Sequence, residues 1–381
     1  MLARLNSTIC GLLAAAAWAS ADPATALAKA VLPPGLKIVQ LDAGLDRPAG
    51  IDVSAAGHLA VGSYGDSLYL YERLPDGNVI RHILSGMRAP TGVAWLGDDL
   101  VLTQGSYLIM IAEPLAKLRE GRALAPQQLA KINKSSGRRF LKYDGERELL
   151  YVGVPSSCNA CQVPGEELAG TIIAYDLKAK SSYVHARGLR APRSLDVHPA
   201  TGELWATDAS AYRHPPVPTP ADELNRITAQ GLHFGHPHCH GIAGPEGEGS
   251  PGCDGYAAPA ALLDARSQPH GLHFIRSDAL LEPGSALVAL RGGWKEKDGG
   301  PRAGFEVRQL LLSADGRQIL GSKPFITGWL DADERYYARP AGIGETAEGS
   351  ILITDSANGA IYIVSKDQGN ASGQHQDAGG N

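Results

Sequence analysis

The sequence lacks the long apolar run of a membrane protein and the basic excess of a nucleic-acid-binding protein. After its first 21 residues, no segment is apolar over the roughly 20 residues that a membrane-spanning helix needs. Its 35 Lys and Arg residues are outnumbered by 40 Asp and Glu residues, which gives a formal net charge of -5. A nucleic-acid partner would need a basic face, so neither nucleic-acid binding nor stable membrane insertion is expected. The hydrophobic share of 44% is enough to bury a sizeable core.

The first 21 residues have the pattern of a secretory signal peptide. Arg4 gives a positive start, residues 10–19 form a short apolar run, and an Ala-Ser-Ala site at 19–21 offers small residues for cleavage. The alternative is a buried N-terminal helix. Export predicts a periplasmic or secreted protein.

Cysteine is scarce, since the chain has five and removal of residues 1–21 leaves four. An even number of cysteines in an oxidising compartment suits two disulfides. Closeness in the sequence favours the pairs Cys158–Cys161 and Cys239–Cys253. A zinc site built from the Cys-x-x-Cys segment and nearby histidines is the alternative.

Helical periodicity is scarce as well, because only residues 114–130 and 221–224 are candidates for helices. Elsewhere short β-rich runs alternate with Gly, Pro and Asp turns, which is typical of an all-β fold. A Pro, an apolar strand, a Gly-containing turn and a second apolar strand recur as one phrase. Its six copies begin near residues 47, 89, 139, 192, 269 and 339.

Six copies of this size predict six four-stranded blades, and blades close into a propeller. We therefore expect an all-β, six-bladed β-propeller over residues 32–366, with no separate second domain. The longest gaps follow Pro192 and Pro269, so inserted loops are expected there. Residues 367–381 are rich in Gly, Gln, Asp and Asn and are expected to form a disordered tail.

Arginine recurs at one position of the repeat, one or two residues before the proline. Equivalent positions of a propeller lie around one axis, so these side chains should converge if their strand is the innermost of its blade. Clustered guanidinium groups favour an anionic ligand, and their forked geometry suits a planar polycarboxylate. The alternative is that each arginine faces solvent or pairs with a neighbouring blade. The residues are Arg47, Arg88, Arg190 and Arg339, with Arg138 and Arg139 in the degenerate third copy.

Several motifs stand out from residue 157 onward. They are Ser157-Cys158-Asn159-Ala160-Cys161, Gly188-Leu189-Arg190-Ala191-Pro192, Asp222-Glu223-Leu224-Asn225-Arg226-Ile227 and His233-Phe234-Gly235-His236-Pro237-His238-Cys239. With shorter matches they make most of residues 136–365 resemble the glucose/sorbosone dehydrogenase family, and the first motif resembles its sorbosone branch. Members of that family are six-bladed propellers that use pyrroloquinoline quinone (PQQ) with calcium.

The resemblance implies a PQQ-dependent oxidoreductase that oxidises a small sugar or aldehyde, with calcium assisting the quinone. Arg190 and Arg339 match positions that hold the quinone carboxylates, and Arg291 matches a basic residue facing the cofactor. The backbone carbonyls of Ser210 and Ala211 match calcium ligands, a role open to any residue because calcium takes oxygen ligands. No Cys-x-x-Cys-His haem motif is present, so an external electron acceptor is expected.

The chain departs from this family at the catalytic base. The family places a histidine just before the strand that ends in Tyr151-Val152, whereas residues 83–184 contain none. Oxidation of a hydroxyl needs a base to take its proton. His270, directly after the proline of the fifth copy, is the candidate replacement, because a histidine can titrate near neutrality. Lys134 and Tyr212 are further candidates. Family residues at the cofactor are also replaced, by Ala191, by Ala209-Ser210 and by Ala341.

Two other functions stay open. The missing base favours a ligand-binding propeller without catalysis. A calcium-dependent lactonase or esterase, as in other six-bladed propellers, would want Glu, Asn and Asp ligands where this repeat carries Arg, Ala and Gln. A run of histidines also has two interpretations, as metal ligands or as loop structure: His233, His236, His238 and His240.

Overall fold

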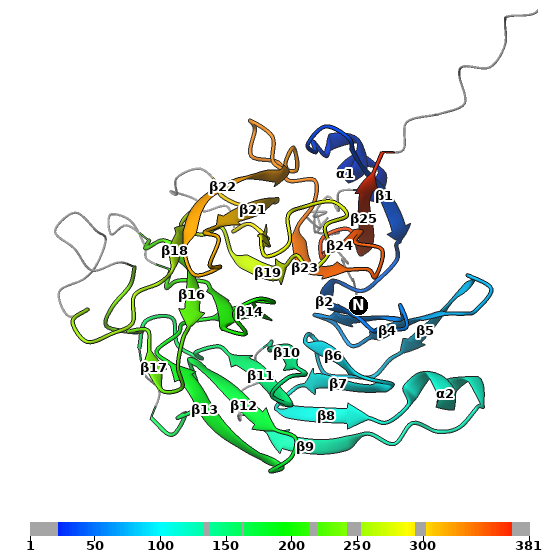
Figure 1. The fold of residues 1–381 in the computed structure, drawn as a ribbon, viewed down its shortest axis with the longest axis horizontal. Coiled ribbons are helices and arrows are strands. Elements are labelled where there is room, and N and C mark those ends of the chain that lie inside the picture. Colours follow the sequence, from blue (N-terminus) through cyan, green and yellow to red (C-terminus); the bar gives the residue numbers. More distant parts are fainter. Residues whose placement is uncertain are drawn as a thin grey trace, which may run out of the picture.

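A computed structural model describes residues 22–132, 138–161, 164–212, 219–241, 253–293 and 302–367. In this part of the chain, six sheets follow one another around a central axis (Figure 1). The fold is therefore an all-β, six-bladed β-propeller, which confirms the prediction from the repeat. The expected signal peptide lies outside the described residues, as does the expected tail apart from Asp367, whose amide donates to the Gly35 carbonyl at 2.8 Å.

The first three blades are made of consecutive strands, named in order from the axis outward. Blade one has β2 (Pro48–Val53), β3 (Leu59–Ser63), β4 (Leu68–Arg73) and β5 (Val79–Leu84). Blade two has β6 (Val93–Leu96), β7 (Asp99–Gln104), β8 (Tyr107–Ile111) and β9 (Gln127–Lys131). Blade three has β10 (Phe140–Asp144), β11 (Leu149–Val154), β12 (Thr171–Asp176), β13 (Ser181–Arg187) and the short parallel β17 (Leu232–His233).

Blades four and five span longer stretches of sequence, and blade six is completed by the N-terminal strand. Blade four has β14 (Pro192–Val197), β15 (Leu204–Asp208), β16 (Asp222–Ile227) and β18 (Ala261–Leu263). Blade five has β19 (Pro269–Phe274), β20 (Ala286–Leu290), β21 (Glu306–Leu312) and β22 (Ile319–Ile326). Blade six has β23 (Pro340–Glu345), β24 (Ile351–Asp355), β25 (Ala360–Lys366) and, outermost, β1 (Leu36–Asp42).

The ring is closed by the two ends of the described chain. β1 pairs with β25 in an antiparallel register in which Leu36 lies opposite Lys366. The first strand of the chain therefore completes the last blade. The two ends of the described chain meet in this blade and close the ring (Figure 1). Closure of this kind joins the first and last blades, which holds the ring together.

The repeated phrase corresponds to the two inner strands of every blade, so its proline opens the innermost strand in blades one, four, five and six. In these four blades the ladder shifts register directly after the proline, for instance between Pro192 and Ser194 and between Pro269 and Gly271. A β-bulge leaves a residue unpaired and re-aims its side chain. Arg193 and His270 occupy these unpaired positions.

Two short helices lie outside the blades, α1 (Pro23–Lys29) and α2 (Pro114–Arg119). Both begin with proline, whose missing N–H would have no partner in a first turn. The predicted helix over residues 114–130 is wrong beyond residue 119, because residues 127–131 form β9. The predicted helix over residues 221–224 is wrong too, since most of it lies in β16. Pairing with β15 outweighs the weak helix preference of so few residues.

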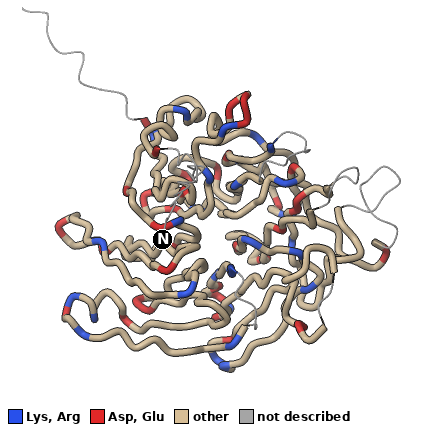
Figure 2. The backbone as a smooth tube through the Cα atoms, turned by 180° about the vertical axis from the view of Figure 1, so that it is seen from behind, with Lys and Arg blue, Asp and Glu red and all other residues tan. Residues whose placement is uncertain are grey.

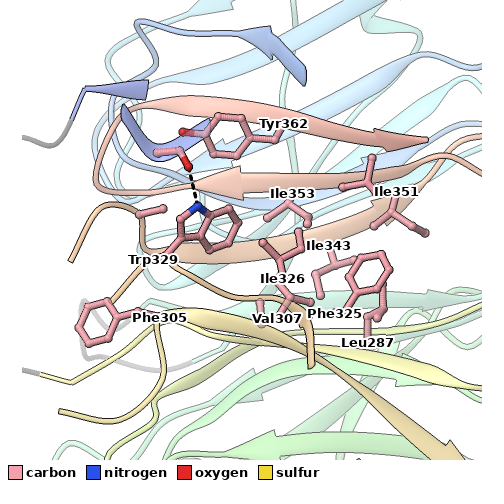
Figure 3. Close-up of a cluster of buried hydrophobic side chains, with 14 of the residues drawn as sticks. Leu287, Phe305, Val307, Phe325, Ile326, Trp329, Ile343, Ile351, Ile353 and Tyr362 are labelled. Carbon is pink, nitrogen blue, oxygen red and sulfur yellow. Dashed lines mark hydrogen bonds between the residues drawn. The ribbon is translucent and has the colours of Figure 1, made fainter. Parts of the chain in front are cut away.

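The hydrophobic core lies between adjacent blades. Between blades five and six, Val307 packs in one cluster with Ile343 and Ile353 (Figure 3). Trp329 belongs to the same cluster, and its indole Nε1 donates a hydrogen bond to the Ala26 carbonyl at 3.0 Å. This bond ties α1 to the outside of blade six. The cavity along the channel is lined by both apolar side chains, such as Ile51 and Leu141, and polar ones, such as Lys142 and His273.

Both predicted disulfides are present, Cys158–Cys161 and Cys239–Cys253. All four cysteines of the described chain are therefore oxidised, and the alternative zinc site has no thiolates to use. No helix in the described ranges is long and apolar enough to cross a membrane.

Candidate functional site

Tyr64 is the centre of a group of aromatic and basic side chains at one mouth of the channel. It directly follows β3 and is 5% exposed. The rings of Phe140 and His270 meet it edge-on, with centroids 6.4 and 6.1 Å away. The guanidinium carbons of Arg138 and Arg291 lie 4.7 and 5.5 Å from its ring centroid. Blades one, three and five thus meet at one phenol.

Three more arginines, Arg190, Arg193 and Arg339, belong to this group. We call the whole group the mouth cluster: Arg138, Arg190, Arg193, Arg291 and Arg339 around Tyr64. Burial lowers the pKa of Arg193 to about 10, and its positively charged neighbours Arg190, Arg138 and Arg291 act in the same direction. Burial also lowers the pKa of Arg339 to about 10, with Arg291 adding to the effect. The cluster therefore holds several positive charges close together in a partly desolvated place.

The mouth cluster is short of negative charge. Arginines elsewhere pair with carboxylates, as Arg226 does with Glu203 at 2.7 Å and Arg276 with Asp196 at 2.8 Å. Within the described residues, none of Arg138, Arg190, Arg193 and Arg291 forms such an ion pair. Burial raises the pKa of Tyr64 even though the arginines pull it down, so the phenol stays protonated and neutral.

Two arginines of the cluster are fixed by neutral groups. Arg339 donates from Nη2 to the Gly292 carbonyl and lies 5.6 Å from the ring centroids of both Phe305 and Tyr336. Arg291 donates from Nε to Ser356 Oγ at 3.0 Å. These contacts set the direction of each guanidinium. The contact to Ser356 leaves the charge of Arg291 available to an anionic ligand, because a hydroxyl group carries no charge.

The arginine prediction is correct in part. Arg190 and Arg339 lie in the mouth cluster with Arg291, as the resemblance implies. Arg47 and Arg88 are exposed instead, and Arg47 pairs with Asp46 at 3.0 Å. Both line a pocket of about 1270 Å³ that Tyr64 also lines.

Arg139 is also turned away from the ligand side. It is 1% exposed and donates from Nη1 to the Gly105 carbonyl, which fixes it between blades two and three. Sequence reasoning missed Arg193 and Tyr64. The signal for Arg193 was the position after the proline, the same position that His270 occupies in blade five.

His270 is buried at the inner end of the mouth cluster. Its Nδ1 lies 2.8 Å from the Gln268 carbonyl. Because a carbonyl only accepts, Nδ1 carries the hydrogen and Nε2 keeps a lone pair. Burial, together with Arg193 and Arg291, holds the pKa of His270 well below its usual range. The ring is therefore neutral and has a fixed tautomer, and the expectation that His270 titrates near neutrality is wrong, because burial and the neighbouring arginines disfavour its protonated form.

Below Tyr64 and Phe140, a cavity of about 540 Å³ runs along the channel. His270 lines its upper end, and Asp52, Lys142 and His273 line its lower end. Figure 2 shows that positions of both charge signs surround the central opening. At the lower end the charges are matched, since Lys142 Nζ lies 2.8 Å from Asp196 Oδ1. The two ends of the channel therefore differ: among the described residues, Lys142 at the lower end pairs with a carboxylate, whereas Arg138, Arg190, Arg193 and Arg291 at the mouth form no ion pair.

The predicted calcium ligands lie in the loop after β15. Ser210 is 7% and Ala211 0% exposed. The Ser210 amide donates to Asp222 Oδ1 at 2.9 Å, while neither residue's carbonyl accepts a hydrogen bond from the described chain. Asp208 lies opposite Glu223 in the β15–β16 ladder, and burial raises the pKa of both carboxyl groups.

This loop brings two buried carboxyl groups, Asp208 and Glu223, close to the mouth cluster, and Asp208 also interacts electrostatically with Arg190 and Arg193. Two buried carboxylates facing one another and two open carbonyl oxygens suit a hard cation. The described residues contain no group of three or more His, Cys, Asp or Glu side chains that could hold a metal. Any cation here would therefore depend mainly on backbone oxygen.

Other predicted residues lie elsewhere. Lys134 falls outside the described residues. The ring of Tyr212 lies 5.9 Å from the guanidinium of Arg266. In the histidine run, the His236 and His240 ring centroids are 6.0 Å apart, and no metal-binding group is formed by the described residues.

His236→Gln is expected to flatten the pH dependence of stability. Burial lowers the pKa of His236 to about 4, whereas an unfolded histidine titrates near about 6.5. As the pH falls, the unfolded chain binds this proton first, so the group costs stability below about pH 6.5, by about 2 kcal/mol at pH 5. Urea unfolding at about pH 8 and pH 5 measures the effect. Wild type should lose about 2 kcal/mol more than the variant between these pH values; equal losses contradict a buried neutral imidazole.

We compared the chain with known proteins by sequence and by structure. One relative was found by sequence, and many solved structures have a similar fold. No known family model matches the chain. An uncharacterized protein of Borreliella burgdorferi is 24% identical over 353 residues, which span 87% of this chain and 90% of that protein.

Solved structures match nearly the whole propeller. The holo form of the PQQ domain of pyranose dehydrogenase from Coprinopsis cinerea has a TM-score of 0.70 at 17% identity, over 88% of this chain and 97% of that one. The calcium structure of a family AA12 carbohydrate-active enzyme from Trichoderma reesei gives 0.70 at 15% identity, over 89% and 97%. The soluble aldose sugar dehydrogenase of Escherichia coli, in its apo form, gives 0.61 at 16% identity, over 87% and 100%. At such identities the likeness establishes a shared fold.

Proposed function

We propose that this chain is a PQQ-dependent oxidoreductase that oxidises a small sugar or aldehyde, with calcium assisting the quinone. The observation that carries the proposal is the unmatched positive charge of the mouth cluster. Two of the structurally similar proteins are described as a PQQ domain and an aldose sugar dehydrogenase, which supports the same reaction class. An exported protein of this kind would pass its electrons to an external acceptor.

The residues present fit an anionic quinone. Three polar atoms of the mouth cluster are buried and have no hydrogen-bond partner in the described chain: Arg190 Nε, Arg193 Nε and Tyr64 Oη. All three carry hydrogen, so they are donors that await an acceptor. A planar tricarboxylate quinone supplies acceptors on several edges, and its charge would relieve the repulsion among the arginines.

The protein's part in the reaction is to orient and to move protons. When bound, the quinone supplies the acceptor for the hydride that leaves the substrate carbon. Arg190, Arg291 and Arg339 would hold its carboxylates, and the protonated Tyr64 would donate to one of its oxygens. His270 Nε2 takes the substrate's hydroxyl proton, and Gln268 keeps the imidazole in the correct tautomer. The substrate thus loses a hydride and a proton and is oxidised by two electrons.

Calcium would be held at the carbonyl oxygens of Ser210 and Ala211, with Asp208 and Glu223 supplying nearby negative charge. There it would polarise a quinone oxygen as a Lewis acid. The carbonyls of Ser210 and Ala211, which accept no hydrogen bond from the described chain, support this part of the proposal.

A dye-reduction assay tests the proposed activity. The purified mature protein is expected to reduce an artificial electron acceptor with aldoses only when PQQ and calcium are both added, and EGTA should abolish the rate. Protein that takes up the quinone but oxidises no aldose or aldehyde would support the second candidate, a ligand-binding propeller. The absence of histidine from residues 83–184, where the related family has its base, favours that alternative.

A further inference from the structure

Asn159 lies inside the Cys158–Cys161 disulfide loop. It forms hydrogen bonds with Arg190, just before β14, and with Tyr212, in the loop after β15. Its Oδ1 accepts hydrogen bonds from the Tyr212 amide at 2.9 Å and from Arg190 Nη2 at 3.1 Å. Its Nδ2 donates to the Tyr212 carbonyl at 2.5 Å. One carboxamide therefore contacts a guanidinium of the mouth cluster and both polar groups of one peptide residue.

The two partners belong to the two halves of the proposed cofactor site. Arg190 lies just before β14 and is assigned to a quinone carboxylate. Tyr212 directly follows Ala211, whose carbonyl is assigned to calcium. Asn159 is thus the direct hydrogen-bonded link between the guanidinium and the backbone that carries the carbonyl. Just before this loop, the Ser156 amide donates to the Arg190 carbonyl at 2.8 Å, so the main chain of Arg190 is held there as well.

The chemistry of this link needs a carboxamide on a restrained loop. The two lone pairs of Oδ1 serve the two donors, and the N–H serves the carbonyl. Aspartate could not donate to the Tyr212 carbonyl and would neutralise Arg190 instead. Asn159 is exposed, so a free loop would hold it poorly, and the adjacent disulfide reduces the conformations open to it.

We infer that Asn159 is a positioning residue that couples calcium binding to quinone binding, and that the Cys158–Cys161 disulfide maintains this coupling. Calcium at the Ala211 carbonyl fixes the Tyr212 peptide, Tyr212 fixes Asn159, and Asn159 holds Arg190 towards the quinone. Coupling between two ligands is reciprocal, so the quinone must tighten calcium binding by the same factor. The inference rests on the proposed function and adds to it a named route between the two ligands.

The test is the ratio of the PQQ dissociation constants measured by titration in EGTA and in saturating calcium. For the wild type this coupling ratio should exceed about 10, in the range usual for linked sites. In Asn159→Ala it should fall at least about fivefold towards unity, while the dissociation constant in EGTA changes less. The double variant Cys158→Ser/Cys161→Ser, or the wild type after reduction, should lower the ratio in the same direction. Asn159→Asp should also weaken binding in EGTA, because its carboxylate competes for Arg190.

A matched control is Asn78→Ala, which removes an exposed asparagine that bonds Asp76 in the outer hairpin of blade one. Its coupling ratio should equal that of the wild type. A ratio in Asn159→Ala within twofold of the wild type, or a wild-type ratio near unity, overturns the inference while the proposed function stands. Wild type that binds no PQQ in either buffer overturns the proposed function itself. A thermal unfolding midpoint measured for each variant shows whether any loss reflects folding rather than coupling.

Discussion

Arg193→Gln is expected to weaken PQQ binding by about 10- to 150-fold and to stabilise the quinone-free protein. A hydrogen bond to a charged group contributes roughly 1.5–3 kcal/mol, and 1.4 kcal/mol is about tenfold in affinity. In the absence of quinone, the same guanidinium is a poorly solvated charge among like charges, and burial lowers its pKa to about 10. Its removal should therefore raise the free energy of unfolding of the free protein by about 1 kcal/mol.

The opposite signs of these two effects make the test specific. Titration with PQQ gives the affinity, and urea unfolding without quinone gives the stability. Arg276→Gln is the matched control, because Arg276 lies at the other end of the channel and pairs with Asp196 at 2.8 Å. It should destabilise the protein and leave the PQQ affinity unchanged. An Arg193→Gln variant that is less stable and binds PQQ as tightly as the wild type contradicts a ligand role for the mouth cluster.

His270→Gln is expected to lower kcat by about 10²- to 10⁴-fold, the usual contribution of a general base. The glutamine cannot take the substrate's proton, whereas the arginines that hold the quinone remain, so the PQQ dissociation constant should change little. Since burial and Arg193 hold the pKa of His270 well below its usual range, the base stays neutral in mild acid. The acidic limb of the wild-type kcat profile should therefore lie below about pH 6.5.

Steady-state rates across the acidic range measure both effects. His273→Gln is the comparison, because His273 lies three residues further along β19 and bonds Glu345 at 3.0 Å at the lower end of the channel. That variant should keep the wild-type kcat once its folding is checked by thermal unfolding. If His270→Gln keeps kcat within threefold of the wild type, another residue takes the proton.

The sequence was sufficient for the fold because the propeller repeats. The proline phrase marks the inner strands of the blades, and each disulfide joins cysteines that are close along the chain. The sequence did not predict the strand at residues 222–224, because that strand forms by pairing with β15, which local sequence does not reveal. The helix predicted over residues 127–130 was wrong for the same reason, because β9 forms by pairing with β8.

The candidate site was predictable only in outline. Counting arginines before the proline found Arg190 and Arg339 but also selected Arg47 and Arg88, which are exposed. The bulge after the proline is what re-aims a side chain into the mouth, so Arg193 and His270 share a position that matters more. Tyr64 follows β3, the second strand of blade one, so a search of the residues before each first strand does not find it. Its role depends on contacts from three blades, which the sequence of one repeat does not show.

The proposed oxidation depends on the unmatched positive charge at this mouth, and equilibrium uptake of PQQ tests that dependence most directly. The protein should bind one PQQ per chain in the presence of calcium, and Arg190→Gln/Arg339→Gln should abolish the uptake. If wild-type protein that is folded and disulfide-bonded takes up no PQQ at saturating calcium, the mouth cluster does not hold a quinone and the proposed oxidation is wrong.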